Sequence, residues 1–238
     1  EDGILGYAIR NTGSNPRKTA QQCIKDVLDR SGLRGDAKTV VATGYGRLSI
    51  PFADWEVTEI TCHAKGAYYL SPTTRTVIDI GGQDSKVITL DDRGHVTDFT
   101  MNDKCAAGTG RFLEVMAAAL ETELEEMGKR SFMVKKGVRI SSMCTVFAES
   151  EVISLIAEGY RPGEIIRGLH EAVSRRIFGM ARSLKIREGV SFSGGVAKNP
   201  GIVESLKALF GLRIHIPDEP QIIGALGAAL AARDLSRK

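Results

Sequence analysis

The sequence lacks the segments that mark membrane, secreted and nucleic-acid-binding proteins. No apolar run approaches the ~20 residues that a membrane-spanning helix needs. The first residues contain no basic segment followed by an apolar one, so they do not form a signal peptide. Lysine and arginine are scattered and the net charge is only +3, which does not favour a nucleic-acid partner. We therefore expect a cytoplasmic protein that binds neither membranes nor nucleic acids.

Cysteine is also scarce and widely spaced. No two of the four cysteines, Cys23, Cys62, Cys105 and Cys144, form the Cys-x-x-Cys spacing of local zinc or ferredoxin sites. A cytoplasmic chain of 238 residues does not need disulfide bonds to hold its core. Cys23 and Cys62 fall in helical patterns and are expected to be structural. His63 points to a different side of its helix from Cys62, and no histidine has ligand spacing or stands out as a general base.

What the chain does have is an ordinary globular composition, 42% hydrophobic and 26% charged. Apolar runs bounded by turn residues predict strands at residues 5–9, 39–42, 76–80, 86–90, 96–101, 190–192 and 212–216. Caps, prolines and helical spacing predict helices at residues 16–31, 58–70, 111–120, 146–157, 162–185 and 222–235, with a further helix beginning at Pro200.

The order of these elements indicates a duplicated α/β unit. From residue 76 the chain reads three strands, a helix, a helical insert at 121–161, and then alternating strands and helices. Residues 5–70 read as the end of the same series, without its opening hairpin. We expect an N-terminal subdomain at 1–72, which the C-terminal helix at 221–238 could complete, and a second subdomain at 73–220. A ligand cleft is expected between them.

Two glycine-rich turns follow predicted strands, as phosphate-binding loops do. Asp79 lies near the end of one strand, and Gly81 and Gly82 come after it. Their backbone N–H groups could approach a phosphate, and Asp79 could hold Mg²⁺ directly or through water. Gly194 and Gly195 lie between another strand and a helix. A plain tight turn is the alternative at each place, and small residues at 224–229 predict close helix packing. Glycine-rich segments at matching places of a repeated plan favour the nucleotide interpretation.

Cys105 and Cys144 stand where helices are expected to begin. Asp103 is a plausible cap in front of Cys105, and the predicted helix at 146–157 follows Cys144. A helix N-terminus stabilises a thiolate, so both positions suit ligands of a metal or cluster. Two thiolates cannot complete a four-ligand site, but a symmetric dimer would supply four. Buried or incidental cysteines are the alternative.

At these residues the sequence resembles a known family. Segments 77–86, 102–112, 144–151 and 194–199 look like the activator component of 2-hydroxyacyl-CoA dehydratases, whose wider family includes ATPase subunits of benzoyl-CoA reductase. The resemblance covers essentially the whole chain. The two cysteine segments are its most specific part, because sugar and acetate kinases of the same superfold lack them. The resemblance implies an actin/Hsp70/sugar-kinase-like fold with ATP or ADP and Mg²⁺ in the interdomain cleft.

The resemblance also assigns roles to individual residues. It implies that Cys105 and Cys144 from each of two subunits hold one [4Fe–4S] cluster in a homodimer. It implies catalytic or phosphate-side roles for Asp79, Gln83 and Glu149. Nucleotide contacts are implied for eight further residues: Gly81, Gly82, Gly108, Thr109, Gly110, Gly194, Gly195 and Asn199.

The function implied in this way is ATP-driven electron transfer. A ferredoxin or flavodoxin would donate the electron, and the acceptor would be an iron–sulfur enzyme such as a dehydratase or a benzoyl-CoA-type reductase. A small-molecule kinase, a non-catalytic nucleotide-binding module and a dimer bridged by structural zinc are the alternatives on this fold.

In one respect the sequence departs from the family. Its members begin with a strand and a phosphate loop of the form Asp-x-Gly-Ser-Thr, and these 238 residues begin after that point. We expect an omitted N-terminal stretch, because an α/β sheet without its first hairpin would expose an unpaired edge.

Overall fold

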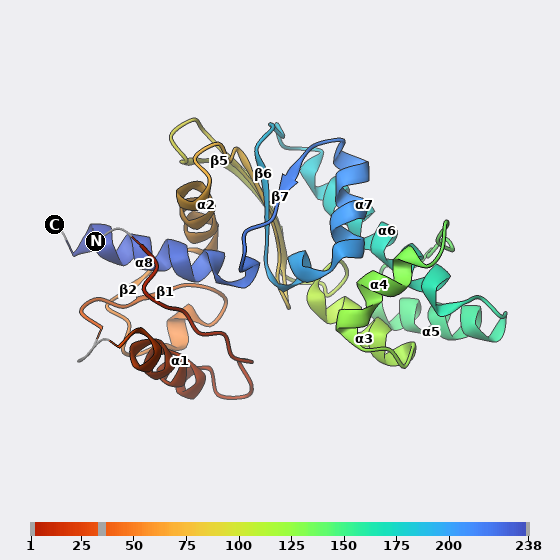
Figure 1. Cartoon of the computed structure of the whole chain (residues 1–238), viewed down its shortest axis with the longest axis horizontal. Coiled ribbons are helices and arrows are strands. Elements are labelled where there is room, and N and C mark those ends of the chain that lie inside the picture. Colours follow the sequence, from red (N-terminus) through yellow and green to blue (C-terminus); the bar gives the residue numbers. More distant parts are fainter. Residues whose placement is uncertain (1–2, 33–36, 237–238) are drawn as a thin grey trace.

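One five-stranded sheet organises the computed structural model, which describes residues 3–32 and 37–236 (Figure 1). Its strand order is β5-β4-β3-β6-β7, and β3 pairs antiparallel with β4 but parallel with β6. The strands are β3 (Thr76–Ile80), β4 (Ser85–Leu90), β5 (Val96–Asn102), β6 (Val190–Ser193) and β7 (Ile214–His215). The predicted hairpin and the two later strands are therefore confirmed, and the structure shows that the later strands are parallel to β3 and to each other.

Helices cover both faces of this sheet. Helix α2 (Glu59–Leu70) lies on one face, while α6 (Pro162–Ala181) and α7 (Pro200–Phe210) lie on the other (Figure 1). Thr58 caps α2 by accepting the N–H of Thr61, and proline at the first position begins both α6 and α7. Helix α6 ends earlier than the predicted residue 185.

The central strand β3 is buried along its whole length, and its side chains alternate between the two faces. Ile78 and Ile80 belong to the large core shared with α6 and α7. Val77 packs instead in the cluster that contains Ala64 and Ala67 of α2. The odd-numbered side chains of β3 therefore face α2, and Asp79 is one of them.

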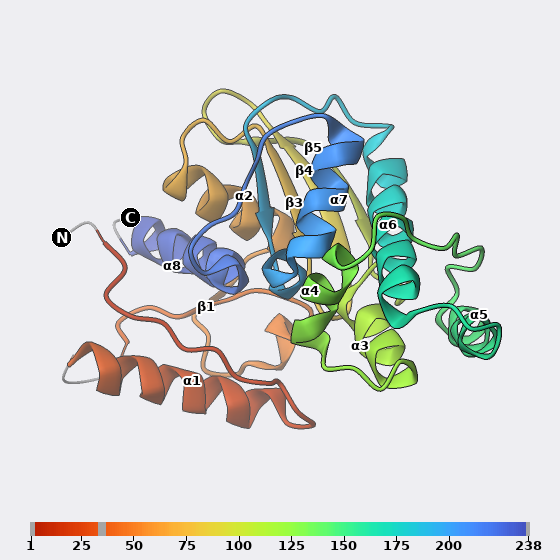
Figure 2. The same cartoon turned by 45° about the vertical axis from the view of Figure 1, so that its right-hand side comes forward.

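The insert after β5 forms an outer helical layer. It contains α3 (Gly110–Ala119), α4 (Met127–Phe132) and α5 (Thr145–Ala157). Helix α5 packs against α3 and α6 and lies at the edge of the molecule (Figure 2). Every helix in the described part of the chain is too short or too polar to cross a lipid bilayer.

The N-terminal part contains α1 (Pro16–Ser31) and the parallel strands β1 (Val41–Ala42) and β2 (Trp55–Glu56). Gly32, at a left-handed φ of 67°, ends α1 as predicted. The strand predicted at residues 5–9 is wrong, because that segment is irregular and no described strand pairs with it. The subdomain division at residue 72 stays a prediction.

Helix α8 (Ile223–Leu235) packs directly on α2 through glycine. A Cβ atom on Gly227 would collide with the carbonyl oxygen of Cys62, and one on Gly66 would collide with that of Ile223. The prediction of close packing by the small residues at 224–229 is therefore confirmed. The two helix backbones are in contact, with no side chain between them at these points.

We expect Gly227→Ala to lower the free energy of unfolding by at least about 2 kcal/mol, because the added methyl forces α8 away from α2. The matched control is Gly179→Ala in α6, where an added Cβ meets no atom within 4 Å. That control should stabilise the protein by about 0.5–1 kcal/mol by removing backbone freedom from the unfolded chain. Urea unfolding measures both. Equal stability of the two variants would contradict the packing argument.

Candidate functional site

A cavity of about 460 Å³ brings together five of the predicted nucleotide residues: Gly81, Gly82, Gly110, Gly195 and Asn199. They come from the β3–β4 turn, the start of α3 and the segment between β6 and α7. The parallel strands β3 and β6 end at the same edge of the sheet, which places their following turns side by side. Residues far apart in the sequence therefore share one cavity.

The β3–β4 turn is joined directly to the start of α3. The N–H of Gly110 donates to the carbonyl oxygen of Gly81 over 2.8 Å, and that of Arg111 donates to Gly82 over 2.9 Å. These N–H groups belong to the first turn of α3 and have no acceptor within their own helix. The turn satisfies them, so its position and that of α3 are linked.

Gly194 has a packing role at the edge of this cavity. Its φ of 86° lies in the left-handed region, and a Cβ there would collide with the carbonyl oxygen of Ile80. Any other residue would push the β6 turn away from β3. Gly194 therefore lets the two glycine-rich turns approach each other, while Gly195 lines the cavity.

Four other predicted site residues do not line this cavity. Gly108 lies under Arg176, whose Cδ would be 2.9 Å from a Cβ on that glycine. Thr109 is fully buried at the N-cap of α3. Gln83 is exposed in the β3–β4 turn, and Glu149 is exposed on α5.

Asn199 is held from two sides. Its Oδ1 accepts the N–H groups of Gly201 and Ile202 over 3.0 and 3.3 Å, which caps α7. Its Nδ2 is thereby left to donate to Nε2 of His170 over 3.2 Å. Burial lowers the pKa of His170 to about 4, so the ring is neutral at pH 7 and can accept this bond. Sequence reasoning missed His170, because nothing near it in the sequence indicates its partner.

Asp79 lies beside the cavity in a buried polar network. Its Oδ1 accepts the Ser193 hydroxyl over 2.8 Å and lies 3.3 Å from Nδ1 of His63, and its Oδ2 accepts from Nζ of Lys86 over 3.2 Å. Burial opposes ionisation of Asp79, but His63, Lys86 and the Ser193 bond outweigh it and lower the pKa of this carboxyl. Asp79 is therefore an ionised anchor inside the protein.

This arrangement decides whether Asp79 can coordinate Mg²⁺ directly, which is one of the roles expected of it. The residue is only 2% exposed, and both carboxylate oxygens already have partners in the protein. Direct coordination of Mg²⁺ by Asp79 does not fit this donor set. The sequence did contain a signal for His63, which sequence reasoning set aside. Glu59 and His63 stand four residues apart on α2 and so share one face of that helix.

Cys144 is at the start of a helix, as predicted. It is the N-cap residue of α5, and its side chain is free and exposed. Cys62 is buried and Cys23 partly buried; in both, burial raises the pKa of the thiol. Cys144 is thus an accessible cysteine at a helix N-terminus, whereas Cys62 and Cys23 lie within helices and are at least partly buried.

Cys105 is also free and exposed, but the helix expected at Asp103–Cys105 is absent. Helix α3 begins only at Gly110. Gly108 has a left-handed φ of 82° and Thr109 is extended, so neither continues a helix from Cys105. Cys105 therefore lies in the loop between β5 and α3. Within residues 3–32 and 37–236, no three His, Cys, Asp or Glu side chains are grouped closely enough to hold a metal ion.

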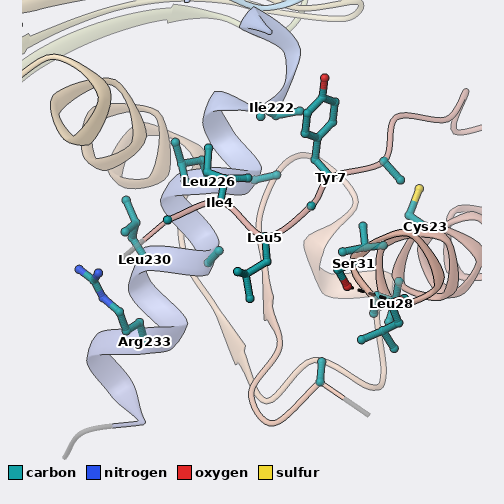
Figure 3. A pocket seen from close by; sticks show the side chains of 18 of the residues that line it. Ile4, Leu5, Tyr7, Cys23, Leu28, Ser31, Ile222, Leu226, Leu230 and Arg233 are labelled. Atoms are coloured by element: carbon teal, nitrogen blue, oxygen red, sulfur yellow. Dashed lines mark hydrogen bonds between the residues drawn. The ribbon is translucent and has the colours of Figure 1, made fainter. Parts of the chain in front are cut away.

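A second cavity, of about 520 Å³, lies between residues 3–8, α1 and α8 (Figure 3). Leu5, Leu28, Leu226 and Leu230 are among the apolar side chains around it (Figure 3). Of the described residues that line it, none belongs to the predicted site. Its wall lacks the glycine-rich turns that a nucleotide phosphate would need, so the smaller cavity is the candidate site.

Comparison with known proteins agrees with this geometry. The family model described as the BadF/BadG/BcrA/BcrD ATPase family matches residues 4–232. The activator of lactoyl-CoA dehydratase from Anaerotignum propionicum is 49% identical over 219 residues, which make up 92% of this chain and 85% of that protein.

Two solved structures are also similar. The crystal structure of (R)-2-hydroxyglutaryl-CoA dehydratase component A from Acidaminococcus fermentans matches with a TM-score of 0.91 at 43% identity, covering 99% of this chain and 91% of that one. The activator of the 2-hydroxyisocaproyl-CoA dehydratase from Clostridium difficile, solved with bound ADPNP, matches with a TM-score of 0.88 at 45% identity. That match covers 95% of this chain and 83% of the other.

These matches confirm the resemblance and the actin/Hsp70-like fold inferred from the sequence. The family model extends from residue 4 to residue 232, a range that includes both glycine-rich turns and both exposed cysteines. The chain belongs to the BadF/BadG/BcrA/BcrD ATPase family.

Proposed function

We propose that this protein is an ATP-driven activator that delivers electrons from a [4Fe–4S] cluster, shared by two copies of the chain, to an iron–sulfur dehydratase or reductase. One observation carries the proposal. The carbonyl groups of Gly81 and Gly82, in the candidate phosphate turn, bond to the first N–H groups of α3. That helix follows directly on the segment containing Cys105, so the nucleotide cavity and a candidate cluster ligand are joined by a short stretch of backbone.

The cavity supports nucleotide binding through its backbone. Gly82 is open to solvent on its Cα side, since a Cβ there would meet no atom within 4 Å. Gly195 and Asn199 lie across the cavity at the entrance to α7. We assign the β3–β4 turn, including the exposed Gln83, to the phosphates and the β6–α7 segment to the adenosine.

The exposed cysteines fit half of a cluster site. Each chain offers two thiols that are both free and exposed, Cys105 and Cys144, and the described residues around them add no third ligand. Four thiolates are the usual ligand set of a [4Fe–4S] cluster, so a second copy would complete it. When bound, the cluster supplies one-electron transfer. The role of this chain is to hold it through the two thiolates, one of them at the N-terminus of α5.

The surface of α5 supports a homodimer. Val146 and Phe147, which follow Cys144 closely, are 68% and 66% exposed, and Ile153 is 56% exposed. Only a narrow stripe of this helix is buried, at Ala148, Val152 and Leu155. An apolar surface of this kind on a soluble domain marks a place where another protein binds, and its position beside Cys144 favours the second copy.

ATP can drive the partner reaction only if the nucleotide binds two states of the protein unequally. Hydrogen bonds between the turn and α3 would move the helix when the turn closes on the phosphates. The loop carrying Cys105 would move with it and change how the dimer meets its partner. A ferredoxin or flavodoxin would supply the electron, and the acceptor would be the dehydratase or reductase.

We expect about four irons per dimer after anaerobic reconstitution, because four thiolates bind one cubane cluster. Cys105→Ser and Cys144→Ser should each abolish the iron and sulfide content and the EPR signal of the reduced protein. Cys23→Ser is the matched control and should retain both. Iron that survives in either of the first two variants would overturn the assignment of ligands.

We expect Gly82→Ala to raise the Kd for ATP by at least about tenfold while leaving the thermal unfolding temperature almost unchanged. The fold has room for the methyl and φ at Gly82 is not left-handed, so only a ligand that approaches the backbone would meet the added group. Isothermal titration with ATP measures the Kd, and Gly179→Ala is the control. An unchanged Kd would show that the phosphates do not approach this turn.

A further inference from the structure

Charged side chains gather on the face of the sheet that α2 covers. Asp79 on β3 lies on that face, and its register partner Lys86 on β4 and Ser193 on β6 contact it there. Glu59 and His63 approach from α2. The network includes residues from both strands that pair with β3, namely β4 and β6, and it lies next to the β3–β4 turn.

Lys86 is the centre of the network. Its Nζ lies 2.7 Å from Oδ1 of Asp84, 2.9 Å from Oε2 of Glu59 and 3.2 Å from Oδ2 of Asp79, and its side chain is 1% exposed. Burial alone would lower the pKa of Lys86, but the charges of Asp79 and Asp84 and the hydrogen bond that Lys86 donates to Asp84 raise it above its ordinary value. One ammonium therefore faces three carboxylates, and it is charged at any physiological pH.

Two of these carboxylates stand on opposite sides of the phosphate turn. Asp79 precedes Gly81 and Gly82, and Asp84 follows them. The N–H of Gly81 donates to the carbonyl oxygen of Asp84 over 3.0 Å, and Oδ1 of Asp84 would lie 3.0 Å from a Cβ on Gly81. Lys86 contacts both Asp79 and Asp84 and thereby holds the two ends of the turn close together. Without its charge, Asp79 and Asp84 would repel each other across the turn.

The third carboxylate connects the turn to another part of the chain. Glu59 is in the first turn of α2, and α2 in turn packs on α8 through glycine backbone contacts. Lys86 therefore links the phosphate turn to the α2–α8 pair as well as closing it. Because the Lys86 side chain is buried, it cannot itself reach a nucleotide in the cavity.

We propose that Lys86 is a positioning residue for the phosphates of ATP. It fixes the β3–β4 turn through Asp79 and Asp84 and ties that turn to α2 through Glu59. The inference rests on the proposed function, since it concerns the same nucleotide site. The opposing view is that Lys86 is only a buried ion pair in the core, whose loss costs stability without any specific effect on the phosphates.

The two views differ in which part of the nucleotide is affected. Lys86→Met, assayed as the reconstituted dimer by isothermal titration, should raise the Kd for ATP by about tenfold or more. The Kd for adenosine, which lacks the phosphates, should stay within about twofold of the wild-type value. Adding Asp84→Asn to Lys86→Met removes a repelling charge from the turn and should recover part of the ATP affinity.

Equal weakening of ATP and adenosine binding in Lys86→Met, or unchanged ATP binding in the folded variant, would overturn the inference. If Lys86→Met does not fold, the single variant Asp84→Asn provides the test. Its side chain is 14% exposed, it loosens one end of the turn, and it leaves Lys86 paired with Asp79 and Glu59. It should weaken ATP binding more than adenosine binding, and the opposite result would overturn the inference.

The experiment also separates failure of this inference from failure of the proposed function. If the wild-type dimer does not bind ATP at all, the proposed function fails. If it binds ATP and Lys86→Met binds it equally well, only the positioning role fails. The iron content of Lys86→Met should equal that of the wild type, because Lys86 contacts neither cysteine segment.

Discussion

The structure depends on compensating the charge of a carboxylate that is buried in the centre of its sheet. Strand β3 has helices on both sides, so every one of its side chains is inside the protein, yet one of them is Asp79. An isolated carboxylate there would cost several kcal/mol. Lys86, Ser193 and His63 compensate for it, and they come from the two neighbouring strands and from α2. The position of α2 on the sheet is thereby fixed by charge as well as by the apolar contacts of Ala64 and Ala67.

This constraint explains why the glycine-rich turn can be both open and well positioned. A turn made of glycine is flexible, and flexibility costs binding affinity because the turn must be ordered when the ligand arrives. Here the residues on either side of Gly81 and Gly82 are held by a shared lysine, and the turn's carbonyl groups are held by α3. Gly82 stays exposed at the tip of the turn while the ends of the turn are fixed.

The sequence predicted the parts of the site that depend on local chemistry. Strand-ending glycines, Gly32 at the end of α1, proline at the start of α6 and α7, and Cys144 at the start of α5 are all readable from neighbouring residues. Cys105 was placed too near a helix start because Asp103 was taken as a cap, whereas Thr109 is the N-cap and the left-handed Gly108 separates α3 from Cys105. The helix itself was predicted at residues 111–120, close to its observed start at Gly110.

The buried network was missed for a different reason. Its members are spread from Glu59 to Ser193, and they meet only through the pairing register of the sheet and the packing of α2 on it. One signal was nevertheless present. Asp79, Lys86 and Ser193 each lie next to an apolar residue in a strand that is buried along its whole length, and polar groups in buried strands require partners. Had those strands been placed side by side, the three residues would have identified one another.

The outer helical layer shows the opposite situation, because it exposes apolar side chains where the sheet buries charged ones. Helix α5 buries a narrow stripe and exposes Val146, Phe147 and Ile153, so it leaves apolar surface without a partner in the described chain. The cysteine at its N-terminus has a free thiol and too few neighbours of its own chain to form a metal site. A second copy related by two-fold symmetry would cover the apolar surface with an identical face, and it would also supply two more thiols as metal ligands. The charges around Asp79 have their partners within the chain, whereas the exposed face of α5 and the thiol of Cys144 would gain theirs from the second copy that we propose.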